Sequence, residues 1–177
     1  AQKSTKFTNC YCGSPLCVPS RSSVLTGLLP LECGAMHNFH SVFCDTATFA
    51  HTSNNVGYET VLSGRMHFIG PDQFHGFEQH LVGDCTPHLH SDAHFSELYG
   101  KYVEMFKQKR ETLDYSGAGY TTIQAFDKDV VQATKEFLTS RKDERPLYLT
   151  VGFISPHPPF IVEKELFDYY DTCMDDV

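Results

Sequence analysis

A cysteine and an arginine lie four residues apart in the segment CVPSRSSVLTG, residues 17–27. Pro19 suits the first turn of a helix, so Cys17 and Arg21 are expected to share one face where that helix begins. The positive end of the helix dipole stabilises an anion there, and arginine adds a planar set of donors for tetrahedral oxyanions. The spacing predicts an oxyanion-binding nucleophile site. A half-buried thiol beside a solvated arginine fits the spacing equally well.

A zinc site is the other chemistry that the cysteines suggest. Cys10 and Cys12 are separated by one residue, whereas zinc ligands in short pairs are usually separated by two or more, and no second Cys or His pair completes a tetrahedral set. Buried thiols are the better interpretation. The chain has seven cysteines, so at least one is unpaired unless it bonds to another chain.

The elements that must position these residues follow from the hydrophobic pattern. Strand-forming residues alternate at Tyr58, Thr60 and Leu62, and the segment that follows, 64–84, has the Gly, Pro and His content of a loop. Residues 145–155 form an apolar run that predicts a strand covered on both faces. Helices and buried strands in alternation indicate a layered α/β domain. The helical segments are 20–29, 46–55, 92–110 and 122–141.

Composition limits the class of protein. The chain has 177 residues, 41% of them hydrophobic, which is enough for one domain with its own core. A formal net charge of -8 argues against general nucleic-acid binding, which needs a basic face. No apolar run has the roughly 20 residues that a membrane helix needs, so no membrane partner is expected. Cytoplasmic, periplasmic and secreted locations all remain open.

The segment from Cys17 to Gly27 resembles the signature of the type I sulfatases, in which the cysteine is oxidised to formylglycine. The family's approach to that motif is similar to FTNCYCGSPLCVPSR in this chain. The family's "GY.T...GK.H" segment resembles GYETVLSGRMHF, and its "PH.PF" loop resembles SPHPPF. The three segments occur in the family's order. Within the family, SGRMHFIGPDQFHGFE, residues 63–78, is most similar to the choline sulfatases.

The resemblance implies an alkaline-phosphatase-like, layered α/β/α fold and hydrolysis of a small-molecule sulfate ester. Cys17 would be converted to formylglycine by a formylglycine-generating or sulfatase-maturating enzyme, and one hydroxyl of the aldehyde hydrate would attack sulfur. By position, Arg21 would hold the hydrate and His67 would take the proton that drives sulfate elimination. His157 would bind a sulfate oxygen and help protonate the leaving group.

Two further roles come with the resemblance. Arg65 stands where the family has a sulfate-binding lysine, so it is expected to bind sulfate, although a planar guanidinium differs in shape from an ammonium. The family also binds calcium or magnesium, and formylglycine from Cys17 is the one metal ligand expected within these residues. Phe68, Phe74, His75 and Phe77 are candidates for an aromatic cage around a choline group. The alternative is that these side chains belong to the hydrophobic core.

The resemblance also indicates the extent of the domain. Residues 1–177 are expected to be part of a sulfatase catalytic domain whose first strand, with an Asp pair, and C-terminal part lie outside this sequence, which leaves this segment alone inactive. A phosphonate or phosphate monoester hydrolase of the same superfamily is the alternative enzyme, because arginine binds sulfate, phosphate and phosphonate groups through similar tetrahedral arrangements of oxygen. An inactive anion-binding relative is the alternative outside enzymes, and a homo-oligomer stays open.

Overall fold

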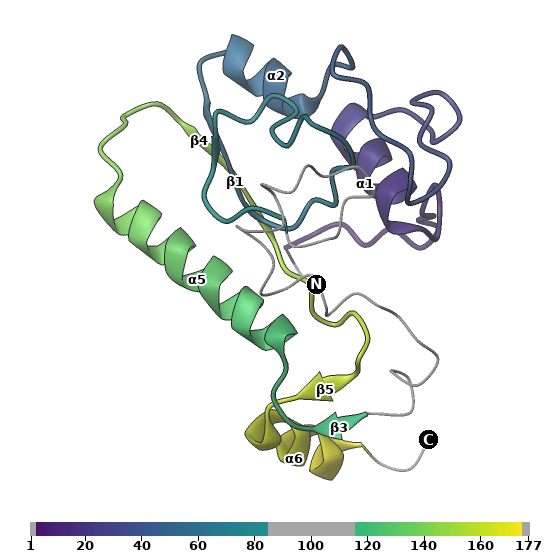
Figure 1. Ribbon diagram of the computed structural model, residues 1–177, viewed down its shortest axis with the longest axis vertical. Coiled ribbons are helices and arrows are strands. Elements are labelled where there is room, and N and C mark those ends of the chain that lie inside the picture. Colours follow the sequence, from purple (N-terminus) through teal and green to yellow (C-terminus); the bar gives the residue numbers. More distant parts are fainter. Residues whose placement is uncertain (1–2, 85–115, 175–177) are drawn as a thin grey trace.

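The computed structural model describes residues 3–84 and 116–174, and its helices and strands alternate along the chain (Figure 1). In chain order they are α1 (Cys17–Thr26), α2 (Phe49–Asn55), β1 (Glu59–Gly64), β2 (Gln79–His80), β3 (Gly117–Ala118), α5 (Thr122–Ser140), β4 (Leu147–Gly152), β5 (Ile161–Val162) and α6 (Lys164–Cys173).

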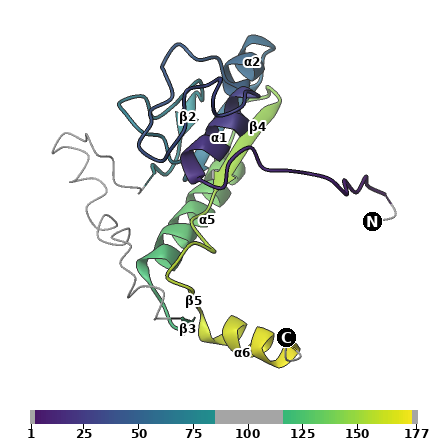
Figure 2. The same cartoon turned by 90° about the vertical axis from the view of Figure 1, so that its right-hand side faces the viewer.

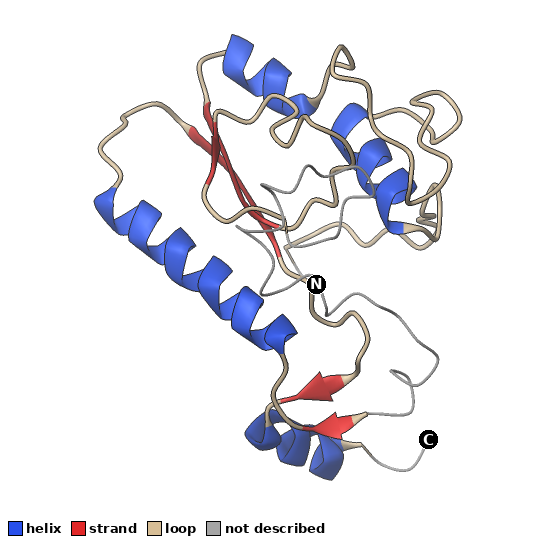
Figure 3. Ribbon diagram, viewed as in Figure 1, coloured by secondary structure: helices blue, strands red, loops and turns tan. Residues whose placement is uncertain are grey.

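A parallel sheet with the strand order β2-β1-β4 lies at the centre. Strands β1 and β4 pair along their full lengths, from Glu59 opposite Leu147 to Gly64 opposite Gly152. Helix α5 lies on one side of this pair, and α1 and α2 lie on the other (Figures 1 and 3). The expected layered α/β/α fold is therefore confirmed for the described residues.

Each face of the sheet has its own hydrophobic core. Towards α1 and α2, Leu62 packs in a buried cluster with Leu25, Ala50, Met66, Phe68 and Phe77. Towards α5, the buried cluster consists of Ile123, Phe126, Val130 and Ile154. Because both faces of β1 are covered, all six of its residues are buried, including the polar Thr60 and Ser63. Thr60 donates to Asn54 of α2 at 2.6 Å, and Thr134 of α5 donates to Ser63 at 2.9 Å.

Burial of the second main strand differs from the expectation. The strand expected around Thr60 is β1, which is the middle strand and is buried on both faces. The apolar run at 145–155 predicts a strand covered on both faces, yet only Gly152 of β4 is buried and Tyr148 is 38% exposed. Within the described residues β4 is an edge strand, which leaves part of its surface uncovered.

The local elements otherwise follow the sequence closely. The helix expected at 122–141 is α5, capped by Thr121, whose hydroxyl accepts from the backbone N–H of Ile123. The helix expected at 46–55 is the shorter α2. The helix expected at 20–29 begins earlier, at Cys17, and ends before Gly27, which has a φ of 73°. The helix expected at 92–110 lies outside the described residues.

A small second unit lies at one end of α5. Strands β3 and β5 pair in parallel there, and α6 packs beside them (Figures 1 and 3). Helix α6 has no buried residue. At the other end of the chain the N-terminal segment extends away from the sheet (Figure 2). No helix in the described part of the chain has the length and apolar character needed to cross a membrane.

Candidate active site

Cys17 is the first residue of α1 and is half-buried. No side chain of the N-cap residue, Leu16, satisfies the first backbone N–H groups of the helix. One of them, from Val18, donates instead to the Asn38 side chain at 3.0 Å. The N-terminus of α1 thus places the Cys17 side chain beside polar groups that favour a negative charge.

Arg21 joins α1 to the segment that follows β1. Its guanidinium Nη1 donates to the backbone carbonyl of Arg65 at 3.3 Å and lies 3.8 Å from the Met66 sulfur. Burial lowers the pKa of Arg21, and the positive charge of Arg65 lowers it further, whereas Asp84 and Cys17 act in the opposite direction. Two cationic side chains therefore lie close together beside Cys17, which is an arrangement that attracts an anion.

Arg65 and His67 are in direct contact. Arg65 is 3% exposed, and its guanidinium Nη2 lies 2.9 Å from Nδ1 of His67. The backbone N–H of Arg65 donates to the carbonyl of Gly152 at 2.8 Å, which ties the end of β1 to the end of β4. His67 itself is 9% exposed and has a φ of 60°, an unusual value for a residue other than glycine.

Asp84 holds the backbone around His67. Its carboxylate Oδ2 accepts from the backbone N–H of Met66 at 3.0 Å and from that of His67. Asp84 is only 3% exposed, so these charge-assisted hydrogen bonds are formed in a dry environment. They fix the turn that directs the His67 side chain. Asp84 was not identified from the sequence.

A second carboxylate holds the segment that carries His157. Asp127 of α5 accepts from the backbone N–H of Ile154 at 2.8 Å and from that of Ser155 at 3.1 Å. His157 follows, with its backbone N–H bonded to the carbonyl of Ile154 at 3.0 Å and its Nδ1 2.9 Å from the carbonyl of Pro158. Sequence analysis also missed Asp127, because neither carboxylate lies near its partner in the chain.

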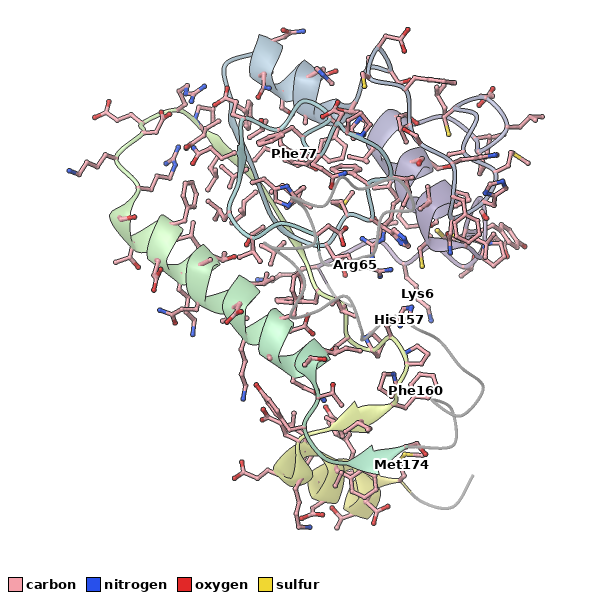
Figure 4. The ribbon with its side chains drawn as sticks, in the orientation of Figure 1. Lys6, Arg65, Phe77, His157, Phe160 and Met174 are labelled. Atoms are coloured by element: carbon pink, nitrogen blue, oxygen red, sulfur yellow. The ribbon has the colours of Figure 1, made fainter. Side chains whose placement is uncertain are left out.

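The parallel pairing of β1 and β4 explains why the expected site residues gather at one edge of the sheet. Arg65 and His67 leave the carboxyl end of β1, and His157 follows the carboxyl end of β4 (Figure 4). In open α/β sheets this edge is where ligands bind. Contacts join Arg21, Arg65 and His67. The strand order places His157 at the same edge of the sheet.

A groove among the described residues lies beside this edge of the sheet and away from most of the expected site residues. It has a volume of about 860 Å³ and runs between α5 and residues 155–166, with Ile123, Phe160 and Leu166 among its lining. His157 lines the groove, but Cys17, Arg21, Arg65 and His67 do not. The groove therefore shares one residue with the candidate active site and is otherwise separate from it.

The described residues alone do not form a metal site. Among residues 3–84 and 116–174, no group of three or more His, Cys, Asp or Glu side chains could hold a metal ion. The described residues therefore do not fit a bound calcium or magnesium by themselves.

An aromatic cage for a quaternary ammonium is not formed. Phe68 and Phe77 belong to the core beside β1, and His75 is 1% exposed with its ring 4.5 Å from that of Phe68. Only Phe74 is exposed, at 47%. The core interpretation therefore holds for Phe68, His75 and Phe77 and not for Phe74.

Known proteins of similar sequence match nearly all of this chain. The family model described as "Sulfatase" matches residues 1–176. The choline-sulfatase of Rhizobium meliloti (strain 1021) is 36% identical over 183 residues, which cover 98% of this chain and 35% of that protein. An arylsulfatase of Clostridium perfringens is 25% identical over 195 residues, which cover 96% of this chain and 39% of that protein. The chain thus spans little more than a third of these relatives.

Solved structures agree on the fold. A protein solved in complex with its substrate D-glucosamine-2-N,6-O-disulfate superposes with a TM-score of 0.61 at 18% identity, over 96% of this chain and 31% of that one. The phosphonate monoester hydrolase of Agrobacterium radiobacter gives a TM-score of 0.55 at 19% identity, over 86% of this chain and 34% of that one. Mixed α/β structure with parallel strands is common to all of them.

Proposed function

Because this chain belongs to the sulfatase family, we propose that it supplies the nucleophile and anion-binding residues of a sulfuric ester hydrolase. The observation that carries the proposal is the contact between Arg21 and the carbonyl of Arg65 at 3.3 Å. It brings the helix that begins at Cys17 against the segment that contains Arg65 and His67. Two arginines beside a potential nucleophile suit a tetrahedral anionic group with several terminal oxygens, such as a sulfate ester.

The proposed nucleophile is a hydroxyl of hydrated formylglycine at position 17. Its oxygen attacks sulfur and loses its proton to solvent while the bond from sulfur to the alcohol oxygen breaks, and His157 gives a proton to that departing oxygen. His67 then removes the proton of the second hydroxyl, the carbon–oxygen bond to sulfate breaks, and the aldehyde re-forms as sulfate leaves. Arg21 and Arg65 stabilise the negative charge throughout.

The proposed substrate is a small organic sulfate, with choline sulfate as the first one to test. The relative that is 36% identical over 98% of this chain is a choline-sulfatase, and this supports the choice. Phe68, His75 and Phe77 are buried, so recognition of the choline group is not assigned to these three residues.

The test uses the natural protein from its own cells. Fragment masses across the Cys17 peptide should show that CH2SH has become CHO, and the protein should hydrolyse choline sulfate. Cys17→Ala should abolish turnover, whereas Cys44→Ala should not, because Cys44 is an exposed thiol outside the site. An unmodified thiol without turnover would contradict the proposal. Faster turnover of the matching phosphonate ester would favour the phosphonate hydrolase instead.

A further inference from the structure

We infer that Arg65 is a positioning residue that decides which nitrogen of His67 carries the proton. The inference rests on the proposed function, because it concerns the base that releases sulfate. It starts from the distance of 2.9 Å between guanidinium Nη2 of Arg65 and Nδ1 of His67. Both side chains are buried at 3% and 9% exposure, so water competes little for this contact.

The chemistry of the guanidinium and the imidazole allows only one direction for this hydrogen bond. A guanidinium has N–H donors and no acceptor, so Nδ1 of His67 must accept with its lone pair. A neutral imidazole that accepts at Nδ1 carries its proton at Nε2. While the contact lasts, His67 therefore presents an N–H group at Nε2, which can donate to an oxyanion but cannot take up a proton.

The backbone keeps the pair together. The N–H of Arg65 is bonded to Gly152 at 2.8 Å, and the N–H of His67 is bonded to the buried carboxylate of Asp84. With His67 at a φ of 60°, these bonds set the turn between the two residues. The guanidinium can turn about its own side-chain bonds, whereas the positions of both main chains are fixed.

A bound oxyanion changes this arrangement. Sulfate offers the guanidinium two oxygen acceptors at once, which is a stronger match than a single imidazole nitrogen. As the guanidinium turns to the anion, Nδ1 loses its donor. Nδ1 can then take a proton from water while Nε2 returns one to water, so the number of protons on His67 is unchanged. Nε2 now has a lone pair, and His67 becomes a base only when an anion is bound.

The experiment measures the His67 tautomer directly by NMR of protein labelled with 15N-histidine, in which Nδ1 and Nε2 differ in chemical shift according to which carries hydrogen. A spectrum of His67→Gln identifies the signals. Inorganic sulfate is the probe, with chloride at equal ionic strength as its control. We expect a proton at Nε2 without sulfate, and a shift towards a proton at Nδ1 as sulfate binds.

Variants separate the guanidinium from general effects. Arg65→Met should show mixed tautomers without sulfate and bind sulfate about tenfold more weakly or worse, because one charge-assisted contact is lost. Arg65→Lys should restore the preference for Nε2–H, because an ammonium also only donates. The control is Arg145→Met, since Arg145 is an exposed arginine that precedes β4 at the opposite end of the sheet and pairs with Glu78.

The outcomes are decisive for both halves of the inference. A proton at Nδ1 in the sulfate-free protein, or the wild-type tautomer in Arg65→Met, would overturn the positioning role. An unchanged tautomer at saturating sulfate would overturn the release by the anion, as would the absence of sulfate binding. None of these readouts needs turnover or formylglycine. A protein without hydrolytic activity could therefore still pass this test, and an active one could fail it.

Discussion

The carboxylate of Asp84 accepts a hydrogen bond from the backbone N–H of His67. The same oxygen, Oδ2, accepts from the N–H of Met66 at 3.0 Å. One buried oxygen thus fixes two consecutive peptide groups at the point where the chain leaves β1. Asp127 does the equivalent for the chain leaving β4, but it uses both of its oxygens. This difference leads to opposite expectations for amide variants at the two positions.

Asp84→Asn should be tolerated better than Asp84→Ala. The amide oxygen of asparagine can accept from both N–H groups, because both use one oxygen of the aspartate. Alanine leaves two buried donors unpaired, at a cost of about 1–3 kcal/mol each. Urea unfolding measures the difference, and turnover should fall most in the alanine variant. Equal stability of the two variants would mean that the hydrogen bonds to the backbone contribute little.

Asp127→Asn should behave like Asp127→Ala. Ile154 donates to one carboxylate oxygen and Ser155 donates to the other, so the amide nitrogen of asparagine would face an N–H donor. We expect either variant to lose about 1–2 kcal/mol of unfolding free energy and to misplace the His157 segment. Glu136→Gln, on the exposed part of the same helix, is the control and should lose less than about 0.5 kcal/mol. A stable Asp127→Asn variant with unchanged turnover would refute this account.

Gly64→Ala should prevent the normal pairing of β1 with β4. Gly64 has a φ of 89°, and an added Cβ would lie 2.2 Å from the carbonyl oxygen of Gly152 and 2.8 Å from Val130. We expect a loss of about 3 kcal/mol or more, from steric conflict and backbone strain together. The matched control is Gly57→Ala, because Gly57 has a φ of 87° and no atom within 4 Å of the added Cβ.

The Gly57 variant isolates backbone strain alone, which costs about 1–2 kcal/mol. The excess loss in the Gly64 variant, measured by thermal or urea unfolding, is therefore the steric part. If both variants lost the same free energy, the close approach of β1, β4 and α5 at Gly64 would be wrong.

Stability should fall as the pH drops below 6.5 because of His75. This side chain is 1% exposed, and neither ring nitrogen has a hydrogen-bond partner among the described residues. Burial lowers the pKa of His75 from its ordinary value of 6.5, although the Asp72 carboxylate opposes the shift. Below pH 6.5 the unfolded chain therefore binds a proton that the folded chain does not, which favours unfolding by up to about 1.4 kcal/mol per pH unit.

His75→Gln tests this expectation because glutamine does not titrate. The slope of the unfolding free energy between pH 6.5 and about 5 should be smaller in this variant than in the wild type. His37→Gln, at an exposed histidine, should keep the wild-type slope. Identical slopes in wild type and His75→Gln would assign the acid sensitivity to other groups.

Local pattern was sufficient to predict α1, α2, α5 and the presence of the two main strands, whereas α6 and the two-residue strands were not predicted. The amphipathic spacing at 122–141 corresponds to α5, and Gly27 marks the end of α1 as its type suggests. The order of the three motif segments identified the family, which the match of the family model over residues 1–176 confirms. The roles of Cys17, Arg21, His67 and His157 stay predictions.

Burial could not be predicted from local hydrophobicity alone. Strand β1 contains the polar residues Glu59, Thr60 and Ser63 and is fully buried, whereas the more apolar β4 is partly exposed. The cause is the position of each strand in the sheet, because a middle strand is covered by helices that come from distant parts of the chain. Residue type records only the average environment of a position.

The sequence by itself determined the chemistry that is available: a cysteine at a helix start, two arginines and two loop histidines in the order typical of a sulfatase. The tertiary structure decided which of these groups meet. Arg21 contacts the carbonyl of Arg65, the side chain of Arg65 contacts His67, and Asp84 holds His67 from a separate loop. Helical spacing depends on neighbours within a few residues, whereas these contacts depend on how β1 and β4 pair and which helices cover them.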